Sequence, residues 1–173
     1  IICIADPQAA AERDKRMISS TEDQTAAPPI PNPPHNLGPG ILRTDDPHSG
    51  VLFIQGRVEY GGKSGLFDDV VGQGFSLLAR GDLARVLREG QREFLDSISA
   101  HVLRLAQGET TGGEAFVDLE GRYVGWFEEH GCEAVLVRPD FYVFGAVRRL
   151  EEVPDLVADL QAQLTGVSRT GGE

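Results

Sequence analysis

The sequence predicts an α/β domain in which helices cover both faces of a mixed β-sheet. From residue 74 onward, strand-like and helix-like segments follow each other in the order β-α-β, then α-β-β-α. The first β-α-β unit should be right-handed, so its two strands should be parallel. A β-α-β unit followed by a helix, a hairpin and a closing helix is the thioredoxin-like arrangement. This is the fold that we expect.

The strands of this prediction are short runs rich in β-branched and aromatic residues. They are expected at residues 51–60, 74–80, 101–106, 134–137 and 141–144. Residues 138–140 (Arg-Pro-Asp) have turn chemistry, which makes the last two runs a hairpin. Residues 61–65 (GGKSG) are expected to form a turn or loop.

The helices are predicted from apolar residues that recur at steps of three and four. The first covers residues 82–98, where Gly90 can divide it into two. The next covers residues 119–130 and ends at Gly131, because glycine readily adopts the left-handed conformation that terminates helices. The last helix carries its apolar stripe over residues 150–164.

Changes of composition divide the chain into four parts. We expect a helical arm (1–20), a proline-rich extended linker (21–48), the thioredoxin-like domain (49–165) and a disordered polar tail (166–173). Asp6 is a suitable N-cap for the helix of the arm.

The net charge and the first residue of the chain limit which partners and which cellular location we expect. The 173 residues carry a formal net charge of −11, which disfavours nucleic acid and anionic membrane surfaces as partners. No apolar run approaches the length that spans a bilayer. The chain starts at Ile1 and its single methionine is Met17. We therefore expect a piece of a larger cytoplasmic protein.

The thioredoxin-like order raises the question of a redox site. Thiol chemistry on this fold needs a cysteine at the start of the helix after the first strand, where the helix dipole stabilises thiolate. Residues 80–84 (RGDLA) occupy that position, and Glu133 stands where active members have a cis-proline. Cys3 and Cys132 lie far apart in the sequence, so we expect two reduced thiols. A redox protein that uses Cys132 remains an alternative.

Two glycine-containing segments fail as nucleotide-binding motifs. Gly62-Lys63-Ser64 resembles the end of a phosphate-binding loop, but Arg57 stands where that loop needs a glycine. Gly72-Gln73-Gly74 begins like a dinucleotide fingerprint, but Leu77 replaces its third glycine and the strand follows instead of preceding.

The remaining candidate groups are better explained as structural. The histidines lack metal-ligand spacing; they are His35, His48, His101 and His130. The charged groups are expected to be caps or surface and interface ions; they are Asp68, Asp69, Arg138, Arg148 and Arg149. The aromatic set is expected to fill the core; it is Trp126, Phe127, Phe141, Tyr142 and Phe144. We therefore predict no catalytic, cofactor-binding or metal-ligating residue, with a small-ligand or protein-binding module as a further alternative.

Several blocks of the chain resemble one enzyme family. Residues 65–78 (GLFDDVVGQGFSLL) resemble the signature DD-x-x-G-x-G-F-x-L-L of the C-terminal domain of FAD-dependent aromatic hydroxylases. These enzymes are related to para-hydroxybenzoate hydroxylase, and the likeness is greatest to 3-(3-hydroxyphenyl)propionate hydroxylase-like members. Residues 6–14, 37–40, 52–58 and 134–143 resemble further family segments in the same order, although Ile54 replaces a usual proline.

The resemblance implies a role for this chain inside a larger enzyme. The family's C-terminal domain is thioredoxin-like and usually lacks redox cysteines. The intact enzyme would bind FAD, oxidise NADH or NADPH and hydroxylate a phenolic ring. The flavin-contacting motifs of the family lie in an N-terminal part that this sequence does not contain. The resemblance therefore implies a non-catalytic structural or oligomerisation domain, with the FAD-binding part and a second subunit as partners. Gln55, Asp68 and Asp69 are expected at such a contact.

Overall fold

A computed structural model describes residues 6–22, 36–106, 108 and 114–166 of the chain. The chain consists of two compact units, Ile1–Pro34 and His35–Glu173. The first unit contains helix α1 (Pro7–Glu22), and its N-terminal turn is capped as expected because Asp6 accepts a hydrogen bond from the Gln8 N–H at 2.8 Å. No described helix is long and apolar enough to cross a membrane.

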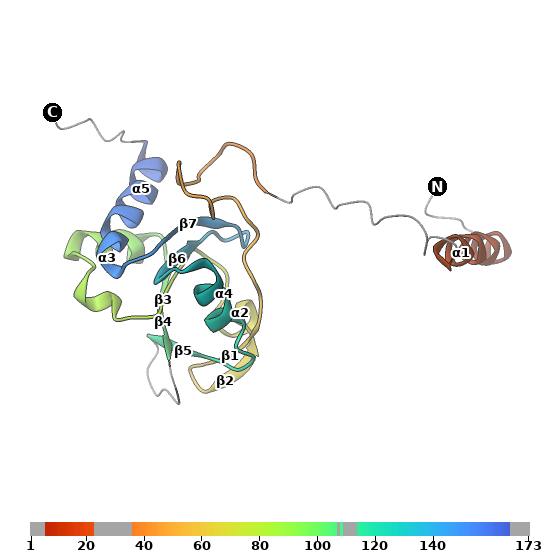
Figure 1. The fold of residues 1–173 in the computed structure, drawn as a ribbon, viewed down its shortest axis with the longest axis horizontal. Coiled ribbons are helices and arrows are strands. Elements are labelled where there is room, and N and C mark those ends of the chain that lie inside the picture. The colour runs from red at the N-terminus through yellow and green to blue at the C-terminus, as the bar shows by residue number, and fades with distance from the viewer. Residues whose placement is uncertain (1–5, 23–35, 107, 109–113, 167–173) are drawn as a thin grey trace. The chain divides into compact units, whose positions relative to one another are not determined.

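The second unit is built on a seven-stranded mixed sheet with the strand order β2-β1-β5-β4-β3-β6-β7 (Figure 1). Its strands are β1 (Arg57–Tyr60), β2 (Lys63–Leu66), β3 (Ser76–Ala79), β4 (His101–Ala106), β5 (Ala115–Asp118), β6 (Ala134–Val137) and β7 (Val143–Val147). Strand β4 runs parallel to both β3 and β5, and the other neighbouring strands are antiparallel.

Helices bury the sheet from both sides. They are α2 (Phe67–Val70), the 3-10 turn η2 (Leu83–Arg85), α3 (Glu89–Ser97), α4 (Arg122–His130), the 3-10 turn η3 (Leu150–Glu152) and α5 (Val153–Thr165). One core lies under α2 and α4 and includes Val58, Leu78, Phe116, Tyr123 and Phe127. The other lies under α3 and α5 and includes Leu77, Leu95, Leu136, Phe144 and Leu156. Figure 1 shows α4 and α5 on opposite sides of the sheet.

This topology confirms the predicted thioredoxin-like fold. The unit β3-α3-β4 supplies two parallel strands, and α4-β6-β7-α5 supplies the helix, the hairpin and the closing helix. Strand β6 pairs antiparallel with β3, so the four strands lie in the order β4-β3-β6-β7. Strands β5, β1 and β2 extend this sheet beyond β4.

Three local predictions differ from the structure. The run at residues 51–60 is divided between the two ends of the sheet, because Leu52 bridges Tyr142 beside the edge strand β7, whereas β1 begins at Arg57 and lies between β2 and β5. The expected loop at 61–65 is instead a hairpin that continues into β2. Its two turn residues are glycines with φ of 57° and 75°, a left-handed conformation that favours glycine. Strand β5 is absent from the sequence prediction, because a four-residue strand carries little periodicity.

A segment that we call the strap (residues 37–53) covers the β7 edge of the sheet. The Gly50 N–H donates to the Val143 carbonyl at 2.8 Å, and the Arg43 N–H donates to the Phe144 carbonyl at 2.9 Å. Arg43 also forms an ion pair with Asp159 on α5 at 3.1 Å. The strap thus supplies partners to an edge strand that would otherwise present unpaired backbone groups.

The carboxylate of Asp46 fastens the middle of the strap. One oxygen accepts the His48 N–H at 3.0 Å and lies 3.1 Å from His48 Nδ1. The other accepts the Ala146 N–H of β7 at 2.6 Å. The Asp46 side chain is only 7% exposed, so its carboxylate replaces water as the acceptor for these donors.

Replacing Asp46 with alanine should lower the free energy of unfolding by about 2–4 kcal/mol, because it leaves the half-buried His48 N–H and the buried Ala146 N–H without this acceptor. Urea unfolding followed by circular dichroism measures this. Asp96→Ala is the matched control, because Asp96 is exposed on α3 and should change stability by less than about 0.5 kcal/mol. Equal midpoints for the two variants would show that Asp46 does not hold the strap.

Candidate functional site

The end of the sheet where a thioredoxin-like enzyme holds its thiol contains no cysteine within the described part of the chain. Strand β3 ends at Ala79, and the three-residue turn η2 separates it from α3, with Asp82 accepting the Ala84 N–H at 2.9 Å. The Arg80 N–H donates to the Glu133 carbonyl at 2.9 Å, and their side chains lie 4.0 Å apart as an ion pair. This end of the sheet is therefore bridged by a backbone hydrogen bond and a surface ion pair.

An apolar side chain fills the space beside Gly81. A Cβ atom placed on Gly81 would overlap Leu150 Cδ1, although the φ of Gly81 is not in the left-handed region. Leu150 begins η3 and is half-buried. A side chain at position 81, including that of a cysteine, would therefore require Leu150 to move.

Cys132 is buried in surroundings that disfavour its thiolate form. It is 1% exposed, and its thiol donates to the His130 carbonyl at 3.4 Å. Burial raises the pKa of the Cys132 thiol, the negative charge of Asp46 raises it further, and Arg148 opposes this only in part. A thiol in this environment is a poor nucleophile. Cys3 lies outside the described residues.

The described histidines are engaged with neighbouring oxygen atoms and do not form a metal site. His130 Nδ1 lies 2.8 Å from the Trp126 carbonyl, and its ring stacks on Trp126 with 4.4 Å between centroids. The His48 ring packs edge-on against His130 at 5.1 Å, and His101 Nε2 lies 3.4 Å from the Gln73 carbonyl. Among the described residues, no three potential ligands come close enough to hold a metal ion. His35 lies outside those residues.

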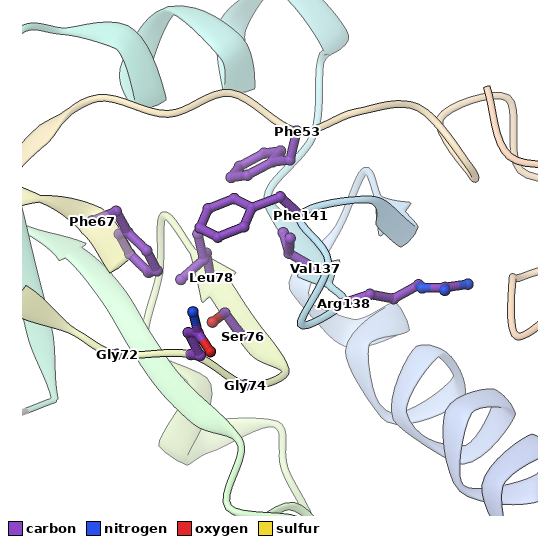
Figure 2. Close-up of a pocket in the computed structure, with 10 residues that line it drawn as sticks. Phe53, Phe67, Gly72, Gly74, Ser76, Leu78, Val137, Arg138 and Phe141 are labelled. Carbon is purple, nitrogen blue, oxygen red and sulfur yellow. The ribbon is translucent and has the colours of Figure 1, made fainter. Parts of the chain in front are cut away.

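A small cavity lies at the opposite end of β3 from Gly81. Figure 2 shows the rings of Phe53, Phe67 and Phe141 around it, with Ser76 and Gly74 on the far side. Its volume, measured as space open to the centre of a water molecule, is about 10 Å³, which accommodates about one water molecule. Neither a phenolic ring nor an isoalloxazine ring fits into this space. The aromatic set predicted to form the core accordingly contributes Phe141 to the cavity wall, whereas Trp126, Phe127 and Phe144 are buried.

The glycines of the two rejected motifs have structural roles. Gly62 closes the β1–β2 hairpin and Lys63 begins β2, so this segment does not wrap around a phosphate. Gly72 and Gly74 have φ of 103° and 148°, and they form the turn that leads into β3. No cradle for the phosphates of FAD exists at either place.

Gln55 and Asp68 meet at the surface as part of what we call the polar corner (Gln55, Asp68, Glu120 and Arg122). The Gln55 side-chain amide donates to the Asp68 carboxylate, and Arg122 donates to the Gln55 carbonyl at 3.3 Å. Arg122 also pairs with Glu120 at 3.4 Å. The other acidic residue of the pair, Asp69, is exposed and has no side-chain hydrogen bond within the described part. The structure thus brings two of the three expected contact residues together.

Comparison with known proteins identifies the family. The model of the HcaD C-terminal domain matches residues 50–163, which is more than half of the chain. The chain belongs to the HcaD C-terminal domain family. It is therefore a C-terminal domain of the kind found in FAD-dependent aromatic hydroxylase-like proteins, as the sequence motifs indicated.

Relatives of this HcaD C-terminal domain are longer proteins. The chain is 30% identical to the probable NADH-specific resorcinol 4-hydroxylase of Rhodococcus jostii (strain RHA1), covering 94% of this chain and 30% of that protein. It is 38% identical over 104 residues to a 3-(3-hydroxy-phenyl)propionate/3-hydroxycinnamic acid hydroxylase of Comamonas testosteroni, covering 54% of this chain and 18% of that protein. The chain thus spans less than a third of the length of either curated relative.

A solved structure shares the fold. The flavin-dependent monooxygenase PieE, crystallised in complex with FAD and substrate, matches with a TM-score of 0.51 and 21% identity. The match covers 92% of this chain and 31% of that one. At this level of identity the likeness concerns the fold alone.

Replacing Gly81 with alanine should lower the free energy of unfolding by about 1–3 kcal/mol, because the new Cβ displaces Leu150. Leu150→Ala in the same chain should remove most of that cost, so the double variant should lose less than the sum of the two single variants. Urea midpoints measure all three.

Gly90→Ala is the matched control for this change, because no atom lies within 4 Å of the added Cβ and the residue lies in α3. This control should be neutral or more stable by up to about 1 kcal/mol. If the Gly81→Ala chain were as stable as the Gly90→Ala chain, the space beside Gly81 would have room for a side chain.

Proposed function

We propose that this chain is the non-catalytic structural domain of a FAD- and NAD(P)H-dependent hydroxylase that acts on a phenolic ring. The observation that carries the proposal is that residues 80–84, where the fold would otherwise hold a reactive thiol, contain no cysteine and have Leu150 packed beside Gly81. The buried thiol of Cys132 and the water-sized cavity at the other end of β3 support it further. In this proposal the reaction takes place in the remainder of the enzyme.

The names of the relatives support the class of reaction. One relative is described as NADH-specific and acts on resorcinol, and another acts on 3-(3-hydroxy-phenyl)propionate. Both compounds contain a phenolic ring, so a phenolic substrate is proposed for the enzyme to which this chain belongs. FAD is proposed as the cofactor of that enzyme, because the motif blocks of this chain resemble FAD-dependent aromatic hydroxylases; PieE, which shares the fold, also binds FAD. Neither the two glycine turns nor the cavity beside β3 offers a place for FAD, since the turns hold no phosphate cradle and the cavity holds about one water molecule.

The strap suits a domain that is attached to a larger part. It is the stretch of chain through which the domain joins residues nearer the N-terminus, and it is fixed to β7 and α5 by hydrogen bonds and the Arg43–Asp159 ion pair. A connection that is held in this way enters the domain at a defined place instead of swinging freely. The polar corner is proposed as part of the contact with the rest of the enzyme, because Gln55 and Asp68 are arranged at the surface and serve no buried structural purpose.

A stand-alone redox protein that uses Cys132 is the alternative from a different class of function. It would need a thiolate that a substrate can reach, and the structure buries the thiol and raises its pKa. A small-ligand module is the other alternative, and the cavity beside β3 is too small to be its binding site.

The burial of Cys132 can be tested by alkylation of the Cys3→Ser chain, in which it is the single thiol. Iodoacetamide should react with the folded chain at least about 100-fold more slowly than with the chain in guanidinium, because only opened molecules expose the sulfur. Mass spectrometry of timed samples gives both rates. Similar rates in the two conditions would favour the redox alternative.

The raised pKa of Cys132 also predicts a pH dependence of stability. A thiol whose pKa is higher in the folded state stabilises the fold fully below its unfolded pKa, and this contribution is lost as the pH rises. Between about pH 8 and about pH 10, the Cys3→Ser chain should therefore lose more stability than the Cys3→Ser/Cys132→Ala chain. Equal losses of stability in the two chains over this pH range would contradict a raised pKa for Cys132.

The proposal that FAD binds to the remainder of the enzyme, and not to this chain, can be tested directly. The purified chain is mixed with FAD, free cofactor is removed by gel filtration, and the visible absorption spectrum is recorded together with NADH oxidation. We expect no retained flavin band and no NADH oxidation above that of free FAD. A flavin that stays with the chain would mean that residues assigned to structure form a cofactor site, and the proposed function would be wrong.

A further inference from the structure

Phe141 covers the small cavity at the start of β3 with a ring that is held less firmly than its neighbours. Phe53 and Phe67, which also line the cavity, are buried, and each packs against two further rings of the core at centroid distances of 5.0–6.0 Å. Phe141 is half-buried, and within the described part of the chain its ring pairs with no other aromatic ring. Figure 2 shows the Phe141 ring pointing into the space among Phe53, Phe67 and Leu78. The cavity wall thus combines fixed rings with one partly exposed ring.

The backbone of Phe141 has a conformation that its side chain does not favour. Its φ is 63°, in the left-handed region, which bulky side chains rarely adopt. Hydrogen bonds hold this residue on both sides, because its N–H donates to the Arg138 carbonyl at 3.0 Å and its carbonyl accepts the Phe53 N–H at 2.7 Å. The part that can move is therefore the side chain, by rotation about its Cα–Cβ bond. Backbone strain of this kind is concentrated at ligand-binding and switch positions.

The space behind Phe141 matches a benzene ring that carries one hydroxyl group. The Phe141 side chain occupies the outer part with a six-membered aromatic ring of its own. The cavity that remains has a volume of about 10 Å³ open to the centre of a water molecule, which suits one oxygen-sized group. Ser76 lines this cavity and is only 4% exposed (Figure 2). A ring in the place of the Phe141 ring therefore has room for one hydroxyl group, with Ser76 as its hydrogen-bonding partner.

The charges at the cavity favour a neutral ligand over an anion. Within the described part, Arg138 is the only lysine or arginine that lines the cavity. Its guanidinium donates to the Asp140 carboxylate at 2.8 and 3.1 Å and to the Ile41 carbonyl at 2.8 Å, and Figure 2 shows it directed away from the cavity. A carboxylate on the ligand would lie among apolar side chains without a positive partner. A phenol, in contrast, is uncharged at neutral pH.

We propose that Phe141 covers a binding site for a neutral phenol with a single ring. The ring of the ligand takes the place of the Phe141 ring among Phe53, Phe67 and Leu78, and its hydroxyl group bonds to Ser76. The Phe141 side chain turns out towards the solvent, so one ring or the other fills the site. The cavity is too small for a ligand only as long as Phe141 fills its outer part. Because the ligand has to displace this ring, it binds more weakly than its contacts alone would give.

The site lies within the domain and connects to the strap. Phe53 is the last residue of the strap and lines the cavity, so a bound phenol contacts the segment through which the domain joins residues nearer the N-terminus. The inference goes beyond the proposed function and does not rest on it, because phenol binds to this chain without FAD. Phenol binding and flavin retention are separate measurements, so either proposal can fail without the other.

The test is a titration of the 173-residue chain with phenol, followed through its backbone N–H signals by NMR. Saturable shifts should appear at Ser76, Leu78 and Phe141, with a dissociation constant on the order of 1 mM. Phe141→Ala should bind phenol at least about tenfold more tightly, because no ring has to be displaced. Ser76→Ala, which keeps that ring, should bind phenol about threefold to tenfold more weakly, because one hydrogen bond is lost. Benzoate should give no saturable shift in any of these chains.

Phe75→Ala is the matched control, because Phe75 is the other half-buried phenylalanine of the described part and packs against the core under α3 and α5. This variant should bind phenol as the unaltered chain does. An unaltered chain without saturable shifts would overturn the proposal, even if Phe141→Ala binds phenol, because that variant would then contain only an engineered cavity. Equal affinities of the Phe141→Ala and Phe75→Ala chains, an unchanged affinity of the Ser76→Ala chain, or benzoate binding as strong as phenol binding would overturn it as well.

Discussion

Strand β3 is buried on both faces and paired at both edges, and most of the domain follows from that constraint. All four of its residues lie inside, with Leu78 in the core under α4 and Leu77 in the core under α3 and α5. Such a strand needs a cover on each side and a hydrogen-bonding partner at each edge, and the partners are β4 and β6. The thioredoxin-like order of elements supplies both covering layers and both hydrogen-bonding partners.

The elements around β3 could be predicted from the sequence because their signals are local. Gly131 ends α4 with a left-handed φ of 61°, and the apolar stripe of α5 faces the core as its spacing indicated. The strap could not be predicted, because it is held by backbone hydrogen bonds and by Asp46, whose acceptor role depends on the distant Ala146. Residues 51–60 could be predicted only in part for a similar reason. A sequence pattern indicates an extended segment, but it does not indicate which strand that segment pairs with.

The candidate sites divide in the same way. The absence of a cysteine from residues 80–84 could be read from the sequence, but the filling of that space by Leu150 depends on a residue about seventy positions away. Gln55 and Asp68 belong to two different family-like segments of the sequence. The β1–β2 hairpin between these segments brings the two side chains together. The exposure of Leu66 and Leu119 could not be predicted: the sequence placed Leu119 on the apolar face of a helix over residues 119–130, whereas α4 begins only at Arg122.

The strap also determines where the domain can be cut from the rest of the chain without loss of stability. The family match begins at residue 50, but the strap begins at residue 37. A domain excised at the family boundary would lose Arg43 and Asp46 and would leave the N–H and C=O groups of β7 open to another sheet edge. Exchange of this domain between hydroxylases must therefore carry the preceding segment along, since without it the graft would be prone to aggregate through its own edge.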